Sequence, residues 1–310
     1  MTTALYRHKL CLLHDAGPGH PESPSRLQAI EKQLETDKLL EQVLLLEPPV
    51  AQREDLVAIH DPAYVEKIFS TAPSSGLVHL DGDTAMNPHS LQSALLAAGA
   101  VIDATERVLS GRLDNAFCCA RPPGHHAEYG RAMGFCLFGN VAAGAAYALQ
   151  RHQLDRVAIV DFDVHHGNGT EDIFRDESRV LFCSSFQHPF YPYTDISNPG
   201  DNVVYSPLPT GSGSSEFRTA IERDWLPALR RQQPQMIFVS AGFDAHRDDP
   251  LGGLLLDDDD FSWVTRQLAA LAGELCNGRM VSTLEGGYDT AALGRCVSRH
   301  VSELLAAGQA

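Results

Sequence analysis

The stretch IVDFDVHHGNGT, residues 159–170, places metal-binding side chains at the end of an apolar run. Asp161, Asp163 and His165 are spaced two residues apart, so in an extended strand they point to the same side. Ionised carboxylates rarely lie against an apolar strand without a partner that balances their charge. Asp163 and His165 therefore form a natural D-x-H chelate for a cation.

A third ligand for the same cation follows a separate apolar run. Asp244 follows QMIFVSAG, residues 235–242, with one residue between them. Two carboxylates and one imidazole, with one position left open, suit a catalytic Zn²⁺, and Fe²⁺ accepts the same ligands. We therefore predict a metal site formed by Asp163, His165 and Asp244.

The elements that must position these ligands can be predicted from hydrophobic patterns. Short apolar runs alternate with longer helical patterns, which favours an α/β fold with a mostly parallel central sheet and helices on both faces. A single domain over 1–310 is the simplest interpretation, because the chain has no internal repeat or long linker. The acidic run at 254–261 is expected to form an exposed loop that caps the next helix. The predicted strands are 115–120, 156–163, 179–186, 235–242 and 278–286, and the predicted helices include 23–35, 90–109 and 260–275.

Unusual polar residues gather just after these predicted strands. His125 and His126 follow 115–120, and Tyr288 follows 278–286. In an open parallel sheet the carboxyl ends of the strands share one edge, where ligands bind. We therefore expect residues far apart in sequence to converge in one crevice.

Composition limits the partners and the compartment. The formal net charge of −16 disfavours nucleic acid and anionic membranes as partners. It would attract cationic substrates, but a solvated acidic surface without a role is the preferred explanation. No apolar run approaches the length of a membrane span, and residues 1–17 lack the features of a signal peptide. The seven cysteines show no metal-type spacing and are typical of reduced core thiols. We therefore expect a cytoplasmic protein.

The sequence strongly resembles the histone deacetylase family and, more broadly, the arginase/deacetylase fold, which also includes acetylpolyamine amidohydrolases. The Asn-Gly pair in DVHHGNG and the DPLGG run resemble the class II branch most. The matching segments lie in the family's order and span most of the chain: HDAGPGHPESPSRL (14–27), RPPGHHAEYGRAMGFC (121–136), DFDVHHGNGT (161–170), SAGFDAHRDDPLGG (240–253) and LEGGYD (284–289).

The resemblance implies roles for the central residues. Asp163, His165 and Asp244 match the family's zinc ligands. His126 matches the general base, which later acts as general acid. His125 matches the second histidine, which has an electrostatic and orienting role.

The resemblance also implies partners for the two histidines. Asp161 matches the carboxylate behind His125, and Asn168 matches the group behind His126. Since a carboxylate raises the basicity of an imidazole whereas an amide mainly orients it, the two histidine pKa values are expected to differ. Tyr288 matches the tyrosine that donates to the carbonyl oxygen and stabilises the developing oxyanion together with the metal.

Substrate-binding positions follow from the same resemblance. Phe135, preceded by Gly134, and Tyr191 match the positions that line the family's acyl-lysine tunnel, where an aromatic slot suits a methylene chain. Leu251 matches the leucine at the tunnel mouth. Polyamine-selective relatives can carry an acidic gatekeeper near this position, and this sequence does not.

Further implied sites lie around the metal. Arg26 matches an arginine of the internal acetate-release region, whereas His166 matches no assigned role. The family also binds a structural K⁺ beside the zinc, through groups that match Asp161, Asp163, His165, Ser184 and Ser185.

Some segments depart from the family pattern. FGNVA (138–142) replaces FNNVA, FYPYTD (190–195) departs from FYPGTG, and Phe186 stands where a histidine is common. These departures bear on substrate specificity rather than on the type of reaction.

Other functions must be weighed against a lysine deacetylase. A binuclear manganese hydrolase of the arginase kind needs further bridging carboxylates, but Gly167 and His246 occupy the corresponding positions. A non-enzymatic metal sensor or scaffold is disfavoured because His126, Tyr288 and the ligands are all present. An acetylpolyamine or other small-amide deacetylase fits the acidic composition but not Leu251 and the missing gatekeeper.

We therefore predict a zinc-dependent amide hydrolase that removes acetyl groups from N-acetyl-lysine side chains and releases acetate. Acetylated polyamines are the alternative substrate. We expect an acetylated protein, peptide or polyamine as the partner and neither nucleic acid nor a membrane, and the sequence predicts no particular oligomeric state.

Overall fold

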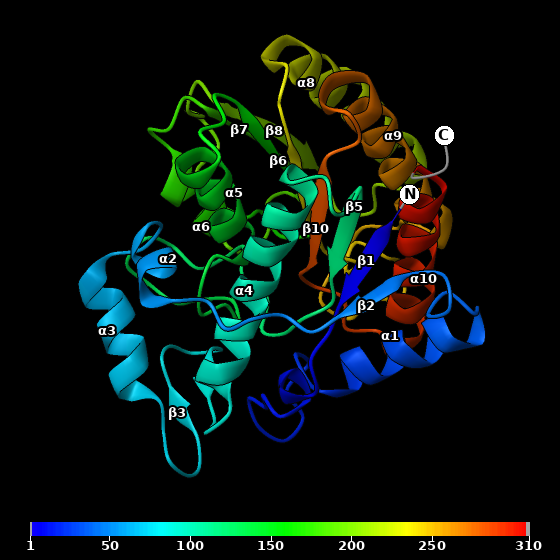
Figure 1. The fold of residues 1–310 in the computed structure, drawn as a ribbon. Helices are drawn as coiled ribbons and strands as arrows, with labels where there is room; N and C mark the ends of the chain where they lie inside the picture. Colours follow the sequence, from blue (N-terminus) through cyan, green and yellow to red (C-terminus); the bar gives the residue numbers. More distant parts are fainter. Residues whose placement is uncertain (1, 308–310) are drawn as a thin grey trace.

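The fold is built on an eight-stranded sheet in the order β2-β1-β5-β10-β9-β6-β7-β8, in which every pairing is parallel (Figure 1). The computed structural model describes residues 2–307. The strands of this sheet are β1 (Thr3–Tyr6), β2 (Leu44–Leu46), β5 (Asn115–Cys118), β6 (Val157–Asp161), β7 (Val180–Gln187), β8 (Val203–Leu208), β9 (Ile237–Ala241) and β10 (Met280–Leu284), and a small antiparallel pair is formed by β3 (Val78–His79) and β4 (Ala85–Met86).

Helices cover both faces of the large sheet. In Figure 1, α4 and α5 lie on one face, and α1, α9 and α10 lie on the other. The helices are α1 (Ser25–Thr36), α2 (Arg53–Val57), α3 (Pro62–Thr71), α4 (Ser90–Leu109), α5 (Asn140–Arg151), α6 (Asn168–Phe174), α7 (Ser214–Ala220), α8 (Leu226–Gln232), α9 (Asp258–Cys276) and α10 (Thr290–Ala307), with a 3₁₀ turn η1 (Lys9–Leu12) and a π-helical turn η2 (Ile221–Trp225).

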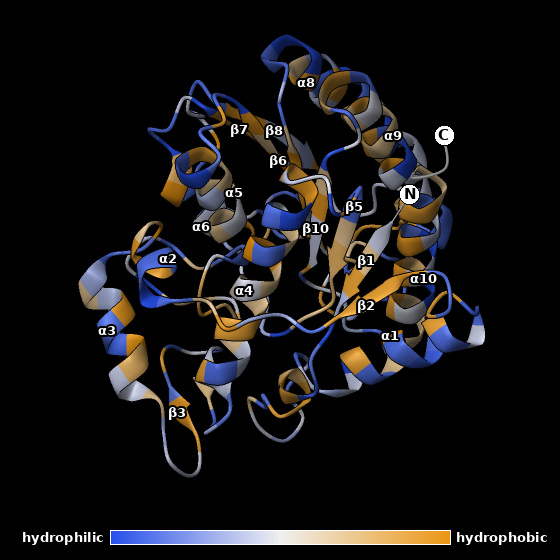
Figure 2. Cartoon of the chain, in the orientation of Figure 1, coloured by the Kyte–Doolittle hydropathy of each residue, from blue (hydrophilic) through white to orange (hydrophobic). Residues whose placement is uncertain are grey.

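Alternation along the strands divides the core into two layers. Ile159 packs into the cluster beneath α4 and α5, whereas Ala158 and Val160 pack into the cluster beneath α9 and α10. Strand β6 is therefore apolar at every position up to Asp161, as expected for a strand covered on both faces. Figure 2 shows the same pattern, with apolar strands inside and polar residues on the outer sides of the helices.

The predicted fold class is confirmed. Every predicted strand and helix is present to within a few residues. The strands β1, β2, β3, β4 and β8 and the helices α2, α3, α5, α7, α8 and α10 were not among the predicted elements. The seven cysteines are free and buried. Among the described residues, no helix is long and apolar enough to cross a membrane.

The acidic run at 254–261 differs from its prediction in one respect. Asp257 caps α9 through a capping box with Asp260, as the prediction of a capping role required. Asp260, however, is fully buried and accepts hydrogen bonds from Arg218 and Ser214. The run is therefore not an exposed loop, because its last acid joins α9 to α7.

Candidate active site

The residues predicted to converge do meet at the carboxyl edge of the sheet. The loops after β5, β6, β9 and β10 surround a cavity of about 630 Å³. Its lining includes His126, His165, Phe135, Tyr191 and Tyr288. The position of this cavity matches the rule that open parallel sheets bind ligands beyond the carboxyl ends of their strands.

Asp163, His165 and Asp244 form a compact group, which we call the crevice cluster. One ligand atom from each lies within 4.8 Å of the other two. His165 Nδ1 lies 3.1 Å from Asp163 Oδ1 and 3.2 Å from Asp244 Oδ2. Asp163 and Asp244 are buried, so two carboxylates are held together away from water.

The crevice cluster fits a divalent cation. Asp244 Oδ1 accepts a hydrogen bond from Val164 N at 2.8 Å, whereas the buried Asp244 Oδ2 accepts no hydrogen bond from the described residues and has only the ion-pair contact with His165 Nδ1 at 3.2 Å. Burial and the charge of Asp163 raise the pKa of Asp244 to about 7. Burial alone lowers the pKa of His165, but Asp163 and Asp244 raise it to about 10. The site therefore favours added positive charge, which a metal supplies.

Two glycines make room for the carboxylates. A Cβ at Gly242 would lie 2.1 Å from Asp163 Oδ2, and a Cβ at Gly286 would lie 2.0 Å from Asp244 Oδ2. Gly286 N also donates to Asp163 Oδ2 at 2.8 Å. Any side chain at either glycine would displace a predicted metal ligand.

His125 is held by a carboxylate, as the resemblance implied. His125 Nδ1 lies 2.9 Å from Asp161 Oδ2, and both side chains are buried. Burial alone lowers the pKa of His125, but Asp163 and Asp161 raise it well above the ordinary value. The protonated imidazole is therefore the favoured form at this position.

His126 is held by an amide whose orientation is fixed. His126 Nδ1 lies 2.7 Å from Asn168 Oδ1, and Asn168 Nδ2 donates to Glu128 Oε1 at 2.8 Å. Because Glu128 accepts from the amide nitrogen, the amide oxygen faces His126, which leaves Nε2 without the proton. Burial and the neighbouring His125 hold the pKa of His126 well below the ordinary value. The neutral base predicted from the sequence is favoured here.

Aromatic side chains form the wall of the cavity. Phe135 lies edge-on to Tyr288 with ring centroids 5.9 Å apart, and Tyr191 lies edge-on to His126 at 5.3 Å. Phe190, which the sequence prediction omitted, stacks on His165 at 5.5 Å and also lines the cavity.

Two predicted substrate-binding residues complete this wall. Leu251 lines the cavity, as the resemblance implied. Gly134 has a φ of 55°, and a Cβ there would lie 2.3 Å from His126 Cδ2. Gly134 therefore allows the backbone to approach the imidazole closely.

Arg26 lies in a buried charge network next to the Tyr288 loop. Its Nε donates to Gly287 O at 2.6 Å, and its guanidinium lies 4.9 Å from the centre of the Tyr288 ring. Glu22 pairs with both Arg26 and Arg121. The role of Arg26 in acetate release stays a prediction.

Three of the predicted potassium ligands lie on neighbouring strands, and Asp163 and His165 lie in the loop that follows β6. Asp161 on β6 pairs in register with Ser184 on β7, and Ser185 pairs with Ser206 on β8. This arrangement brings Asp161 and Ser184 together, but the K⁺ site itself stays a prediction.

His166 has a structural role that the sequence did not suggest. Its Nδ1 lies 3.0 Å from Ser184 Oγ, and its Nε2 lies 2.7 Å from Glu171 Oε2. Tyr205 OH also donates to that carboxylate oxygen. His166 therefore joins the start of α6 to β7.

The sequence prediction missed three acids near the site. Glu128 orients Asn168, as described above. Glu285 is fully buried and accepts from Gly124 N at 2.7 Å and from His125 N at 3.1 Å, so it fixes the turn before the histidine pair. Asp83 lines the cavity from the β3–β4 hairpin, although the sequence near Leu251 showed no gatekeeper acid.

A second group of metal-type ligands lies away from the cavity, and we call it the helix cluster. It consists of His246, Asp258 and Cys296, whose ligand atoms lie within 4.8 Å of one another. Asp258 Oδ1 lies 3.1 Å from His246 Nε2 and 3.6 Å from Cys296 Sγ. Asp258 Oδ2 accepts from Arg295 Nε at 2.8 Å. Protein groups therefore partner both oxygens of this carboxylate.

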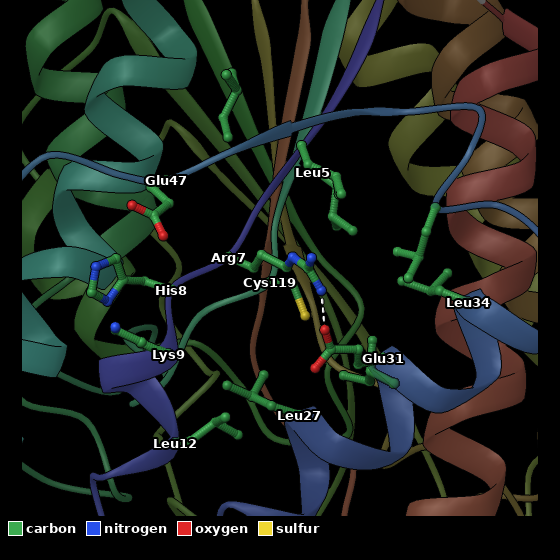
Figure 3. Close-up of a pocket in the computed structure, with 14 residues that line it drawn as sticks. Leu5, Arg7, His8, Lys9, Leu12, Leu27, Glu31, Leu34, Glu47 and Cys119 are labelled. Carbon is green, nitrogen blue, oxygen red and sulfur yellow. Dashed lines mark hydrogen bonds and ion pairs between the residues drawn. The ribbon is translucent and has the colours of Figure 1, made fainter.

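A second cavity, of about 440 Å³, lies between β1, α1 and β2 (Figure 3). Leu5, Leu27 and Leu34 contribute to its apolar wall, and an ion pair joins Arg7 to Glu31 across it. His126 and Tyr288 line the other cavity, so this one is separate from the candidate active site.

Comparisons with known proteins agree with this geometry. The family model described as histone deacetylase domain matches residues 20–304. The chain is 36% identical to the histone deacetylase-like amidohydrolase of Pseudomonas aeruginosa, over 97% of this chain and 86% of that protein. It is 37% identical to a probable deacetylase of Archaeoglobus fulgidus, over 93% of this chain and 82% of that protein. It is 34% identical to type-2 histone deacetylase 2 of Dictyostelium discoideum, of which it spans only 21%.

A solved structure supports the same assignment. The HD domain of HDA15 matches with a TM-score of 0.91 and 35% identity, covering 98% of this chain and 88% of that chain. The fold and the relatives define a hydrolase of the deacetylase and amidohydrolase type. The chain belongs to the histone deacetylase family.

Proposed function

We propose that the protein is a zinc-dependent deacetylase that hydrolyses the amide bond of N-acetyl-lysine side chains and releases acetate. One observation carries this proposal: His165 of the crevice cluster lines a single aromatic-walled cavity together with His126 and Tyr288, and Asp163 and Asp244 lie against His165. A metal held by Asp163, His165 and Asp244, Zn²⁺ or Fe²⁺, would polarise the acyl carbonyl and acidify the attacking water.

His126 is the proposed general base. Its Nδ1 faces Asn168 Oδ1, so Nε2 carries the free lone pair that can accept the proton of the attacking water. His126 then returns this proton to the leaving amine. Its low pKa favours the neutral form that the first step needs.

His125 and Tyr288 are proposed to stabilise negative charge in the transition state. His125 is held as a cation by Asp161 and lies with its ring centroid 4.0 Å from that of His126. Burial raises the pKa of Tyr288 well above the ordinary value, so its hydroxyl keeps the proton and can donate to the developing oxyanion.

The shape of the cavity supports a long, thin acyl-amine substrate. Phe135 and Tyr191 provide flat apolar walls, and Leu251 adds an aliphatic contact. An extended methylene chain buries apolar surface between such walls, which is favourable by about 0.8 kcal/mol per CH₂ group. An acetylated lysine side chain has this form.

Acetylpolyamines are a second candidate substrate class, and Asp83 favours them. Its carboxylate lines the same cavity, and burial and the charge of Asp81 raise its pKa, so a cation there would relieve the unfavourable charge. A polyamine carries a further ammonium group that can reach such an acid, whereas the alkyl chain of acetyl-lysine carries none.

The test compares initial rates on acetyl-lysine peptides, acetylputrescine and acetylspermidine, for the wild type and for Asp83→Asn. A lysine deacetylase should cleave the peptides faster, and Asp83→Asn should leave the order of preference unchanged. A wild type that prefers acetylpolyamines, with KM for them raised in Asp83→Asn, would favour the second class. Protein loaded with zinc that cleaves none of these amides would contradict the proposed function.

A further inference from the structure

The Tyr288 loop and the Leu251 loop are joined by one buried carboxylate. The first follows β10 and contains Gly286, Gly287 and Tyr288, and the second follows the neighbouring strand β9 and contains Asp244 and Leu251. Asp249, in the second loop, has only 6% of its surface exposed. The side chain of Asp249 therefore lies between the two loops rather than in solvent.

Asp249 accepts hydrogen bonds from both loops. Its Oδ2 accepts from Tyr288 N at 2.6 Å and from Asp289 N at 3.2 Å. Its Oδ1 accepts from Leu251 N at 2.9 Å. One side chain thus fixes the backbone that carries the proposed oxyanion donor and the backbone that carries a wall of the cavity. Hydrogen bonds from backbone N–H groups to a buried carboxylate are among the stronger ones in proteins.

The Tyr288 loop needs such a support. Gly287 has a φ of 123°, which residues with a side chain rarely adopt. Gly286 has no side chain that could pack against its neighbours. The loop is held on its other side by Gly286 N donating to Asp163 and by Phe243 N donating to Gly286 O at 2.9 Å. These bonds hold Gly286, whereas Asp249 holds the residue that carries the phenol.

We infer that Asp249 is a positioning residue, which sets Tyr288 for the reaction and Leu251 for the substrate. This inference rests on the proposed deacetylase function for its effect on rates, but the structural clamp can be tested without activity. The Asp249 side chain does not line the cavity. It acts only through Tyr288 and Leu251, which do line it.

The kinetic test is a double-mutant cycle. Asp249→Ala should lower kcat by about 100-fold, since a misplacement of about 1 Å can cost that much. Tyr288→Phe combined with Asp249→Ala should have the kcat of Tyr288→Phe alone, because the clamp acts on kcat through the phenol. A structural defect would instead lower kcat further, in proportion to the single effects.

The conservative variant Asp249→Asn tests the hydrogen bonds to the two loops separately. In Asp249→Asn, the single remaining oxygen should keep the two bonds from Tyr288 and Asp289, while the bond from Leu251 is lost. We therefore expect kcat close to that of the wild type and a KM raised several-fold. Asp248→Ala is the matched control, because the neighbouring Asp248 side chain is 56% exposed and the charge change is the same. This control should leave both constants unchanged.

Hydrogen exchange provides the readout that does not depend on activity. The amides of Tyr288, Asp289 and Leu251 should exchange faster in Asp249→Ala than in the wild type and in Asp248→Ala. Unchanged exchange in Asp249→Ala would overturn the inference even if the protein proves inactive. If the wild type is active, additive effects on kcat in the double-mutant cycle would also overturn the inference. If the wild type is inactive but the amides exchange faster in Asp249→Ala, the result would count only against the proposed function. If Asp249→Ala does not fold, Asp249→Asn is measured by the same two methods, and the bond from Leu251 is then the one tested.

Discussion

The crevice cluster and the helix cluster bring similar ligand atoms equally close together, but they balance the charge of their carboxylates differently. In the helix cluster, Arg295 supplies the positive charge, and both oxygens of Asp258 have protein partners. In the crevice cluster, two buried carboxylates share the single imidazole of His165, and Asp244 Oδ2 accepts no hydrogen bond from the described residues. Short distances between ligand atoms therefore do not define a metal site, whereas a buried charge that the protein leaves unbalanced does.

The third ligand of each cluster sharpens the contrast. In the crevice cluster the third ligand is His165, whose imidazole lines the active-site cavity. In the helix cluster the third ligand is Cys296. Burial raises the pKa of its thiol, so the thiolate form that would bind a metal is disfavoured. We therefore expect only the crevice cluster to bind zinc.

Removal of one crevice ligand should have the largest effect. Asp244→Ala leaves one carboxylate and one imidazole for the cation, so bound zinc should be lost and no activity should remain above background. Even groups that only orient metal ligands cost about 10- to 100-fold when replaced. Metal content by mass spectrometry and the deacetylation rate check this together, and full zinc content in this variant would remove Asp244 from the ligand set.

Tyr288→Phe should separate proton donation from metal binding at the same site. We expect a loss of transition-state stabilisation of about 3 kcal/mol, which is typical of one oxyanion donor. The zinc content should stay that of the wild type, because the phenol is not a ligand. The measurement is kcat/KM with metal content determined on the same sample, and unchanged turnover would exclude Tyr288 from the reaction.

Replacement of a ligand-type residue in the helix cluster should not change the amount of zinc that the protein binds. Cys296→Ala removes a buried thiol that makes a weak contact with Asp258, and a destabilisation of about 1 kcal/mol is typical of such core changes. Zinc content and deacetylation rate should equal those of the wild type. Denaturant unfolding measures the stability, and loss of one equivalent of zinc would show that our distinction between the clusters is wrong.

The smallest effect concerns the pH dependence of the helix cluster. Burial raises the pKa of Asp258, but Arg295 and His246 lower it below the ordinary value overall. The folded state therefore binds a proton at Asp258 less readily than the unfolded state does. The ion pairs of Asp258 stabilise the fold fully above the unfolded pKa of about 3.9, and this stabilisation is lost as the pH falls through the folded pKa. Asp258→Asn should cost under about 1 kcal/mol at pH 7. Unfolding curves should show the difference from the wild type shrinking below about pH 4, and a constant difference would contradict the assignment.

The central residues of the site could be predicted because their signals are local. Asp163 and His165 form a D-x-H pattern at the end of an apolar strand, and Asp244 follows another apolar strand. Glu128 left no such signal, and Glu285 stood out only as a polar residue at a strand end, without a role, since their partners lie 40 and 161 residues away in the sequence. A buried acid whose partners are a distant amide and backbone N–H groups can be identified only once the chain is folded.

The strands of the large sheet that were missed lie at or next to its edges. Strand β8 contains Pro207, which argues against a strand in a sequence pattern but is tolerated because β8 is the last strand of the sheet. Strand β2, at the opposite edge, has three residues, and its Leu44 and Leu45 are partly exposed. The two edge strands are only partly buried along their length, whereas β6, β7 and β9 are buried at every position.

The buried charge network around Glu22 limits where the chain can be shortened in a recombinant fragment. The family model begins at residue 20, but Arg121 is fully buried and donates to the carbonyl oxygens of Cys11 and His14 at 3.0 and 3.2 Å. A fragment trimmed to residues 20–304 would keep Glu22 and leave the remaining guanidinium hydrogens without acceptors. It would also lack β1, and with it the strand that joins β2 to β5. Expression of the catalytic unit therefore requires the residues before the matched segment, although none of them lines the cavity.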